Sequence, residues 1–170
     1  SLGVERVLMM PDNGGIRALL DRHLKRSHSP HHRWPQVEYL AMEPTSTVDD
    51  TFRAARLLRA QAVAAIGVPG GDRPHRVATF ASDDSPVLGG DGTHRAVVRE
   101  CRDVPLAGLS TGTNNAFPEM RESTVTGIAV ALYATGRLAP EQALASNKLL
   151  EIDINEGSQR DIALVDAVIS

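Results

Sequence analysis

The chain has 170 residues, 42% of them hydrophobic, and a net charge of −3 at pH 7. This length suits one domain, or one domain with part of another. The small negative charge gives no electrostatic attraction to nucleic acid or to an anionic membrane, and we expect neither as a partner. One cysteine, Cys101, excludes an internal disulfide and predicts a structural thiol in a cytoplasmic protein. We see neither a membrane-spanning apolar run nor a signal peptide.

The first 68 residues read as strands alternating with helices. Apolar runs closed by turn residues predict three strands, at 4–10, 37–42 and 63–68. Apolar residues at helical spacing predict a helix over 16–24. Thr47 and Asp50 have the spacing of a capping box, which predicts that a second helix begins there.

The rest of the chain changes period after residue 146. We expect a loop at 69–86, a short strand at 87–88, helices at 93–100 and 125–133, and a strand at 105–109. Gly136 ends the second of these helices, and Pro140 begins a short one. Alternating residues then predict an antiparallel hairpin, with strands at 149–154 and 161–169 around the turn NEGSQ.

These elements predict an α/β fold. Residues 1–146 are expected to form a nucleotide-binding domain with a Rossmann-like parallel sheet, interrupted by an inserted loop at 69–86. Residues 147–170 are expected to begin an antiparallel, all-β domain that is incomplete here. The chain begins without Met and ends inside a predicted strand, so we expect it to be part of a longer protein.

Two glycine loops come directly after predicted strands. They are Gly89–Thr93 and Ser110–Asn115. In parallel sheets, ligands bind at the carboxyl ends of strands, and the amides of a following helix attract anions. Neither loop contains the lysine of a Walker motif or the spacing G-x-G-x-x-G. The sequence therefore predicts phosphate binding by backbone amides.

Asp91 is an acid inside the first of these loops. A carboxylate beside a phosphate is repelled by it, so one interpretation gives Asp91 a task. It would hold Mg²⁺, or accept a proton from a substrate hydroxyl during phosphoryl transfer. The other interpretation is that Asp91 only shapes the turn. Residue types alone leave both open.

The loop has a near copy upstream. GGDRPHR at 70–76 repeats GGDGTHR at 89–95, with an offset of 19 positions (89 − 70). Arg73 and Pro74 replace Gly92 and Thr93, so the upstream copy lacks a glycine and one amide donor. We interpret the upstream copy as an inserted partial duplication, and predict that Asp91 rather than Asp72 is the functional acid.

Taken together, the motifs of this chain resemble those of a known family. GGDGT is the signature of the NAD kinase superfamily, and the stretch VPLAGLSTGTNNAFPEMRESTVTGIAVALYATGR resembles its ATP-NAD kinase and acetoin-catabolism protein X subgroup. The resemblance implies an N-terminal α/β domain, a C-terminal all-β domain and a site between them. It also implies ATP and Mg²⁺ as cofactors and NAD as the substrate, which is phosphorylated on a ribose hydroxyl.

Carried onto this chain, the resemblance assigns the residues of the site. Asp91 is the general base. The expected cofactor-binding residues are Gly89, Gly90, Gly92, Thr93, Thr111, Gly112, Thr113, Asn114, Asn115 and Asp166. We assign no residue as a resident metal ligand, and expect a homo-oligomer with a nucleotide substrate.

One position departs from the family pattern. NAD kinases carry an Asn-Glu pair in a C-terminal strand, and here Val165 and Asp166 occupy those positions. Alternation predicts Asp166 on the apolar face of its strand. This substitution leaves open a different hydroxyl acceptor linked to acetoin catabolism, or a non-catalytic nucleotide-binding regulator. A dinucleotide-dependent oxidoreductase is disfavoured by the absent glycine spacing.

Two other groups of residues have simpler interpretations. The cluster His23, His28, His31 and His32 lies largely in a Ser- and Pro-containing segment without the partners that zinc requires, and predicts a solvated loop. Arg53, Arg56 and Arg59 recur at helical spacing and predict a solvated helix face.

Overall fold

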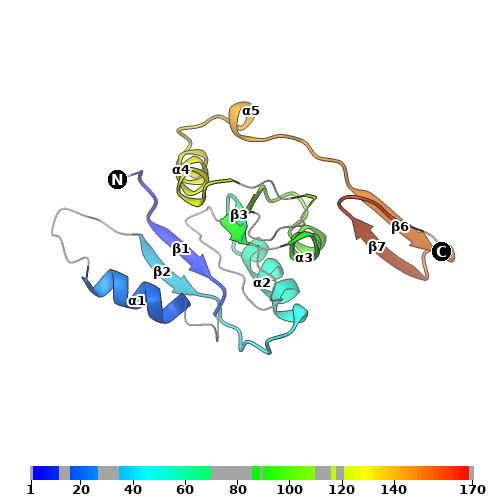
Figure 1. Cartoon of the computed structure of the whole chain (residues 1–170), viewed down its shortest axis with the longest axis horizontal. Coiled ribbons are helices and arrows are strands. Elements are labelled where there is room, and N and C mark those ends of the chain that lie inside the picture. Colours follow the sequence, from blue (N-terminus) through cyan, green and yellow to red (C-terminus); the bar gives the residue numbers. More distant parts are fainter. Residues whose placement is uncertain are drawn as a thin grey trace.

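The structure is a computed structural model, and it describes residues 2–11, 16–26, 35–69, 86–88, 90–109, 116–117 and 121–168. Strands and helices are mixed along the chain (Figure 1), which confirms the α/β class. Their bounds are β1 (Arg6–Met9), α1 (Ile16–Arg26), β2 (Gln36–Tyr39), α2 (Val48–Ala60), β3 (Ile66–Pro69), β4 (Pro86–Leu88), α3 (Asp91–Cys101), β5 (Leu106–Leu109), α4 (Ser123–Ala134), α5 (Pro140–Ala143), β6 (Leu150–Ile154) and β7 (Gln159–Ala163).

The first two strands form a parallel pair. β1 and β2 are in register from Arg6 opposite Gln36 to Met9 opposite Tyr39. Because successive side chains of a strand point to opposite faces, β1 contributes to two apolar clusters. Val7 and Met9 form a small cluster, whereas Leu8 joins the main core.

Strands β3 and β4 occupy equivalent registers on β5. All three are parallel, and each pairs with the other two. Gly67 and Pro86 both pair with Ala107, and the next two residues of each strand pair with Gly108 and Leu109. The paired positions of β3 and β4 thus have the same 19-residue offset as the two GGD motifs.

Two features differ from the sequence prediction. The expected insertion at 69–86 begins and ends within strands, because Pro69 belongs to β3 and Pro86 to β4. In addition, the parallel strands form two hydrogen-bonded groups, β1–β2 and β3–β4–β5, where one Rossmann-like sheet was expected. Strands of three or four residues form few backbone hydrogen bonds with their neighbours. The two groups are instead connected by side chains of the main core, which come from both of them.

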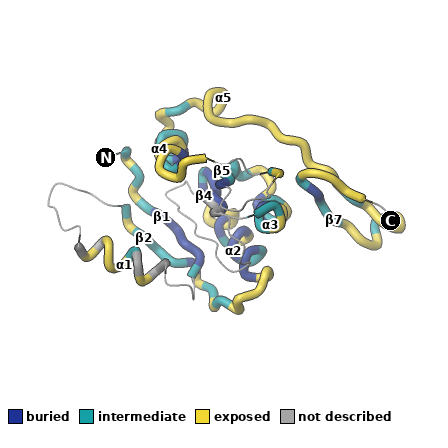
Figure 2. The backbone as a smooth tube through the Cα atoms, viewed as in Figure 1, coloured by how far each residue is buried: buried dark blue, intermediate teal, exposed yellow. Residues whose placement is uncertain are grey.

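The main core lies between the strands and a helix pair. α2 and α3 lie side by side (Figure 1) and bury one face each (Figure 2). The buried residues of this cluster are Leu8, Met10, Leu40, Ala54, Ala55, Leu58, Val63, Ile66, Val68, Val97 and Cys101. Burial raises the pKa of the Cys101 thiol to about 12. A thiol this resistant to ionisation is unreactive, which agrees with the structural role expected of it.

The start of α2 differs in detail from a capping box. Thr47 is the N-cap residue, but its side chain makes no capping hydrogen bond. The Asp50 carboxylate instead accepts backbone N–H bonds from Thr45 at 2.8 Å and Ser46 at 2.7 Å. Burial disfavours its charged form, but the bonds from Thr45, Ser46 and Thr47 outweigh this, so the pKa of Asp50 lies below its ordinary value.

Helix α4 confirms the predicted helix and its end. Glu122 caps the first turn by accepting from the N–H groups of Thr124 and Val125, and Gly136 adopts a φ of 65° just beyond the helix. The buried side chains are Thr126 and Val130, whereas Val125 is 65% exposed. The helix is apolar on more than one face, so its sequence did not identify the buried one.

The antiparallel hairpin is present but shorter than predicted. β6 and β7 pair from Leu150 opposite Ala163 to Ile154 opposite Gln159, and the pair projects away from the helices (Figure 1). The expectation of a strand over 161–169 is wrong beyond Ala163. In the described part of the chain, residues 164–168 pair with no strand, since β6 begins at Leu150, and an unpaired strand edge leaves its backbone groups to water.

Candidate nucleotide site

The first turn of α3 carries the intact glycine motif. Gly90 is the N-cap residue, with an extended backbone, and Asp91 is the first residue of the helix. The Gly90 carbonyl accepts N–H bonds from Thr93 at 3.0 Å and from His94 at 3.1 Å. The first amides of a helix point along its axis without intrahelical partners and attract anions. The Thr93 N–H is already used within this turn, so an anion at the start of α3 would meet the exposed backbone of Gly92.

The Asp91 carboxylate joins this turn to the segment after the second glycine loop. Its Oδ2 accepts a hydrogen bond from the backbone N–H of Ala116 at 3.0 Å. Its Oδ1 accepts from the N–H of Phe117 at 2.9 Å. These two residues come directly after TGTNN in the sequence. Asp91 of the GGDGT motif is thus in contact with the two residues that follow TGTNN in the sequence.

Gly92 has no structural reason to be a glycine. A Cβ added at this position has no neighbouring atom within 4 Å. The backbone there is helical, and its φ is not positive. Glycine in a helix costs about 0.5–1 kcal/mol relative to alanine. Space and backbone conformation at Gly92 would therefore also allow alanine.

His94 is a member of this cluster that sequence reasoning did not select. Its side chain is completely buried, and its Nδ1 lies 2.9 Å from the Gly90 carbonyl oxygen. Its ring packs against Phe117 at a centroid distance of 5.7 Å and a tilt of 57°. The His-Arg dipeptide that both GGD copies share was the available signal.

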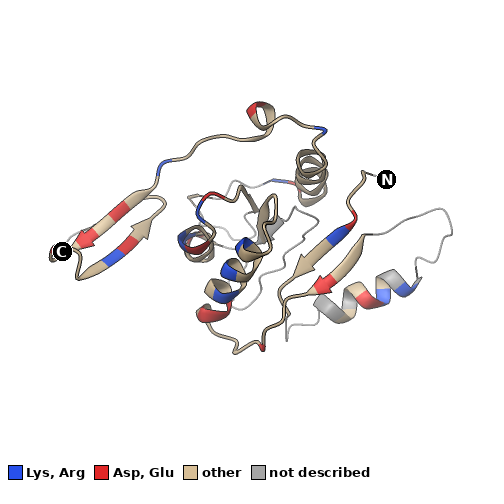
Figure 3. Cartoon of the chain, turned by 180° about the vertical axis from the view of Figure 1, so that it is seen from behind, with Lys and Arg blue, Asp and Glu red and all other residues tan. Residues whose placement is uncertain are grey.

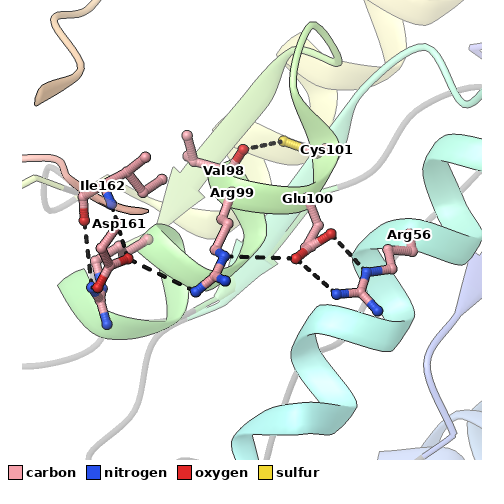
Figure 4. Close-up of polar contacts among 8 residues, drawn as sticks. Arg56, Val98, Arg99, Glu100, Cys101, Asp161 and Ile162 are labelled. Atoms are coloured by element: carbon pink, nitrogen blue, oxygen red, sulfur yellow. Dashed lines mark hydrogen bonds and ion pairs between the residues drawn. The ribbon is translucent and has the colours of Figure 1, made fainter. Parts of the chain in front are cut away.

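Arg95 and Arg99, which follow Asp91 at helical spacing on α3, contact the hairpin (Figure 4). Arg95 donates to the Asp161 carboxylate at 2.6 Å, and Arg99 lies 3.8 Å from the same group. A hydrogen bond from the Ile162 backbone and the Arg95 guanidinium both lower the pKa of Asp161 below its ordinary value. The helix that begins with Asp91 therefore also fixes β7.

A second ion pair joins α3 to α2. Arg56 donates two hydrogen bonds to Glu100, at 2.7 and 3.0 Å (Figure 4). The acidic residues of α2 lie in its first turn, and its arginines follow along the rest of the helix (Figure 3). The expectation of a solvated face is confirmed for Arg56 and Arg59, which are exposed, whereas Arg53 is partly exposed. Arg53 also donates to the Glu43 carbonyl at 3.0 Å.

Similarity to known proteins extends over most of the chain. The family described as the ATP-NAD kinase N-terminal domain matches residues 2–138. The chain belongs to the ATP-NAD kinase family. It is also 58% identical to acetoin catabolism protein X of Cupriavidus necator over 173 aligned residues, which cover 100% of this chain and 43% of that relative. The chain thus spans less than half of the relative's length. No solved structure matches significantly.

The family match agrees with the motifs that carried the resemblance. It identifies the chain as a member of the NAD kinase superfamily, in the acetoin catabolism protein X subgroup. Among the assigned residues, the structure describes Asp91, Gly90, Gly92, Thr93 and Asp166. Gly89 and the loop residues Thr111, Gly112, Thr113, Asn114 and Asn115 lie outside the described residues, as do Asp72 and three histidines of the cluster, His28, His31 and His32.

Asp166 lies outside the strand in which the sequence predicted it. It lies beyond the end of β7, and it is exposed to solvent. Its neighbour Val165 is 50% exposed. The expected place of Asp166 on the apolar face of a strand is therefore wrong, because the strand ends at Ala163.

The described residues contain neither a candidate metal-binding cluster nor a helix that could span a membrane. No group of three or more His, Cys, Asp or Glu side chains suitable for a metal ion occurs in the part of the chain that the structure describes. Within the same ranges, every helix is too short or too polar to cross a membrane.

Proposed function

We propose that the protein is an ATP-dependent phosphotransferase that phosphorylates a nucleotide hydroxyl, with NAD as the acceptor and ATP and Mg²⁺ as cofactors. The observation that carries this proposal is the contact between Asp91 and the amides of Ala116 and Phe117. This contact links Asp91 of GGDGT to the residues that directly follow TGTNN, and the resemblance treats the combination of these two motifs as typical of the family. Membership of the ATP-NAD kinase family supports the same reaction class.

The phosphate-binding role is argued from the start of α3. Gly89, Gly90, Gly92 and Thr93 are proposed to bind ATP phosphates through backbone amides and the positive end of the helix dipole. Thr111, Gly112, Thr113, Asn114 and Asn115 are proposed to line the other side of the nucleotide. Mg²⁺ bound to ATP neutralises phosphate charge during transfer. Asp166 is proposed to contact the acceptor only when the hairpin and its continuation approach the nucleotide.

Asp91 is proposed to accept the proton of the attacking hydroxyl. An ionised carboxylate has about four lone-pair directions on its two oxygens. Each Asp91 oxygen uses one of them on an amide of the described residues, and the proposal gives another to the hydroxyl. The two amides also fix the orientation of the carboxylate, which general-base catalysis requires.

The proposal is tested by measuring NADP formation from NAD, ATP and Mg²⁺. Asp91→Asn removes the proton acceptor and is expected to reduce kcat by about 10²–10⁴-fold. Asp72→Asn is the matched control in the upstream copy, and is expected to leave the rate unchanged. An Asp91→Asn protein that keeps its rate, or an Asp72→Asn protein that loses it, contradicts the assignment.

A second candidate is a nucleotide-binding regulator without turnover. It is favoured by Val165 and Asp166, which replace the family's Asn-Glu pair and lie exposed beyond β7. A kinase for another hydroxyl acceptor linked to acetoin catabolism is the related alternative. Calorimetric titration with ATP and NAD separates them: binding without turnover supports the regulator, and ATP turnover with another acceptor supports the related kinase.

The remaining features of the proposal concern the whole protein. We propose that residues 1–146 form the nucleotide-binding domain and that 147–170 begin an antiparallel β domain. Contact between Arg95 and Asp161 gives the two parts a defined attachment point. We also propose a cytoplasmic location and a homo-oligomeric assembly. Sedimentation of the purified chain with and without ATP measures the oligomeric state directly.

A further inference from the structure

His94 is a buried polar residue that the proposed reaction does not use. It lies one turn after Asp91 in α3, and none of its surface is exposed. A buried imidazole costs free energy unless its polar atoms are hydrogen-bonded. The contacts of this ring therefore show what the fold gains from a histidine at this position.

The first of these contacts defines the protonation of the ring. The Gly90 carbonyl can only accept, so Nδ1 of His94 carries the proton in their 2.9 Å hydrogen bond. The same oxygen accepts the N–H groups of Thr93 and His94, which begin the helix. The imidazole thus holds the N-cap peptide through a third donor and fixes the direction in which the first turn points.

The second contact reaches the segment after the TGTNN motif. The ring of His94 meets that of Phe117 at 57° and 5.7 Å, which is within the range of favourable tilted aromatic pairs. The N–H of Phe117 donates to Asp91. Gly90, His94, Phe117 and Asp91 therefore form a closed circuit of contacts, because Asp91 is also bonded covalently to Gly90.

We propose that His94 is a positioning residue that holds the Asp91 carboxylate against the end of the TGTNN segment. This role rests on the proposed function. The imidazole does two things at once: its Nδ1–H fixes the N-cap carbonyl, and its ring fixes Phe117. Phenylalanine supplies only the ring, and asparagine supplies only a donor near the position of Nδ1. Histidine supplies both.

Two matched variants separate these contributions. His94→Asn keeps a donor for the Gly90 carbonyl and loses the ring, whereas His94→Phe keeps the ring and loses the donor. The first readout is hydrogen exchange of the Ala116 and Phe117 amides, measured by NMR on the full chain without nucleotide. Each variant is expected to accelerate exchange of these amides by about fivefold. His94→Ala, which lacks both, is expected to accelerate it by about 25-fold.

Two controls separate positioning from general destabilisation. Val97→Ala removes a buried side chain one turn further along α3, away from Phe117. It is expected to lower overall stability without selectively accelerating exchange at residues 116–117. Phe117→Leu has a half-exposed site and is expected to fold. It should add little to the effect of His94→Asn, since that variant has already lost the aromatic contact.

A second readout is the rate of NADP formation, which requires turnover, whereas amide hydrogen exchange can be measured without it. In a protein that forms NADP, each His94 variant is expected to lower kcat by about fivefold with the KM for ATP changed less than about twofold. Equal exchange at residues 116–117 in the wild type and His94→Ala overturns the positioning role, whether or not the protein is a kinase. Selective acceleration without any NADP formation supports the positioning role while contradicting the proposed reaction.

Discussion

Strands β3 and β4 occupy equivalent registers on β5, and the sequences after them differ. Both strands pair with Ala107, Gly108 and Leu109 of β5, and their equivalent residues are 19 positions apart. The carboxyl ends of both strands therefore reach the same level on β5. Register alone does not distinguish the two copies.

The residues after the glycines do distinguish them. After β4, the motif leads into α3, where the Asp91 carboxylate binds the amides of Ala116 and Phe117. After β3, the corresponding motif reads GGDRP and lies outside the described residues. A short apolar run is enough to place a strand, but a phosphate loop also requires glycine freedom and amide donors. We infer that the downstream copy forms the site.

The largest expected effect on ATP affinity comes from giving the downstream GGDGT motif the residues of the upstream GGDRP motif. Gly92→Arg together with Thr93→Pro places a long side chain in the open space at Gly92 and removes one amide. We expect ATP affinity, measured by calorimetry, to fall by about 100-fold, equivalent to about 2.8 kcal/mol. The reciprocal change, Arg73→Gly with Pro74→Thr, serves as the control. Affinity that depends on the upstream pair instead would reverse the assignment of the two copies.

A deletion tests whether the protein folds and binds ATP without the upstream GGD motif and β4. Removing residues 70–88 joins Pro69 directly to Gly89 and leaves one strand, one GGDGT motif and α3. Because a long connection between paired elements costs closure entropy, we expect the free energy of unfolding to rise by about 1–2 kcal/mol. Urea denaturation measures this change. A deleted protein that is unfolded, or that no longer binds ATP, shows that β4 is indispensable.

The smallest expected effect compares Arg95 with its upstream counterpart Arg76. Arg95→Gln removes the ion pair with Asp161, which is about half exposed, so the loss in stability is expected to be about 0.5 kcal/mol. Arg76→Gln is expected to have no effect.

The stability that the Arg95–Asp161 ion pair contributes is expected to depend on pH. The pKa of Asp161 is lowered in the folded state from its ordinary 3.8. The stabilisation is therefore present above that value and is lost as pH falls through the lower, folded pKa. Urea denaturation at about pH 7 and about pH 2.5 checks this. If Arg95→Gln destabilises equally at both pH values, the ion pair is not the cause.

The sequence predicted the elements better than their extent. Apolar periodicity located α2 and α3. Each of these helices buries apolar side chains on one face, such as Leu58 of α2 and Val97 of α3. It failed beyond Ala163, because a strand needs a facing partner and alternation cannot show where that partner begins. The single sheet failed for a related reason: local pattern identifies strands but not which of them pair.

The candidate site was predicted only in part, for the same physical reason. GGDGT indicated a phosphate loop because glycine and an acid have local consequences. The contact of Asp91 with Phe117 spans 26 residues, and that of Arg95 with Asp161 spans 66. His94 was overlooked because a histidine on an otherwise apolar helix face has the pattern of an ordinary core residue. Its contacts become visible only when Gly90 and Phe117 are adjacent in space.

The most direct test of a nucleotide site in the downstream copy compares two glycines by titration with ATP and Mg²⁺. Gly92 and Gly127 are both helical, and a Cβ at either has open space around it. Alanine should therefore stabilise both helices by about 0.5–1 kcal/mol. We predict that Gly92→Ala weakens ATP binding by about thirtyfold, equivalent to about 2 kcal/mol, while Gly127→Ala leaves it unchanged. Equal ATP affinity in the two variants would contradict a phosphate site at the start of α3.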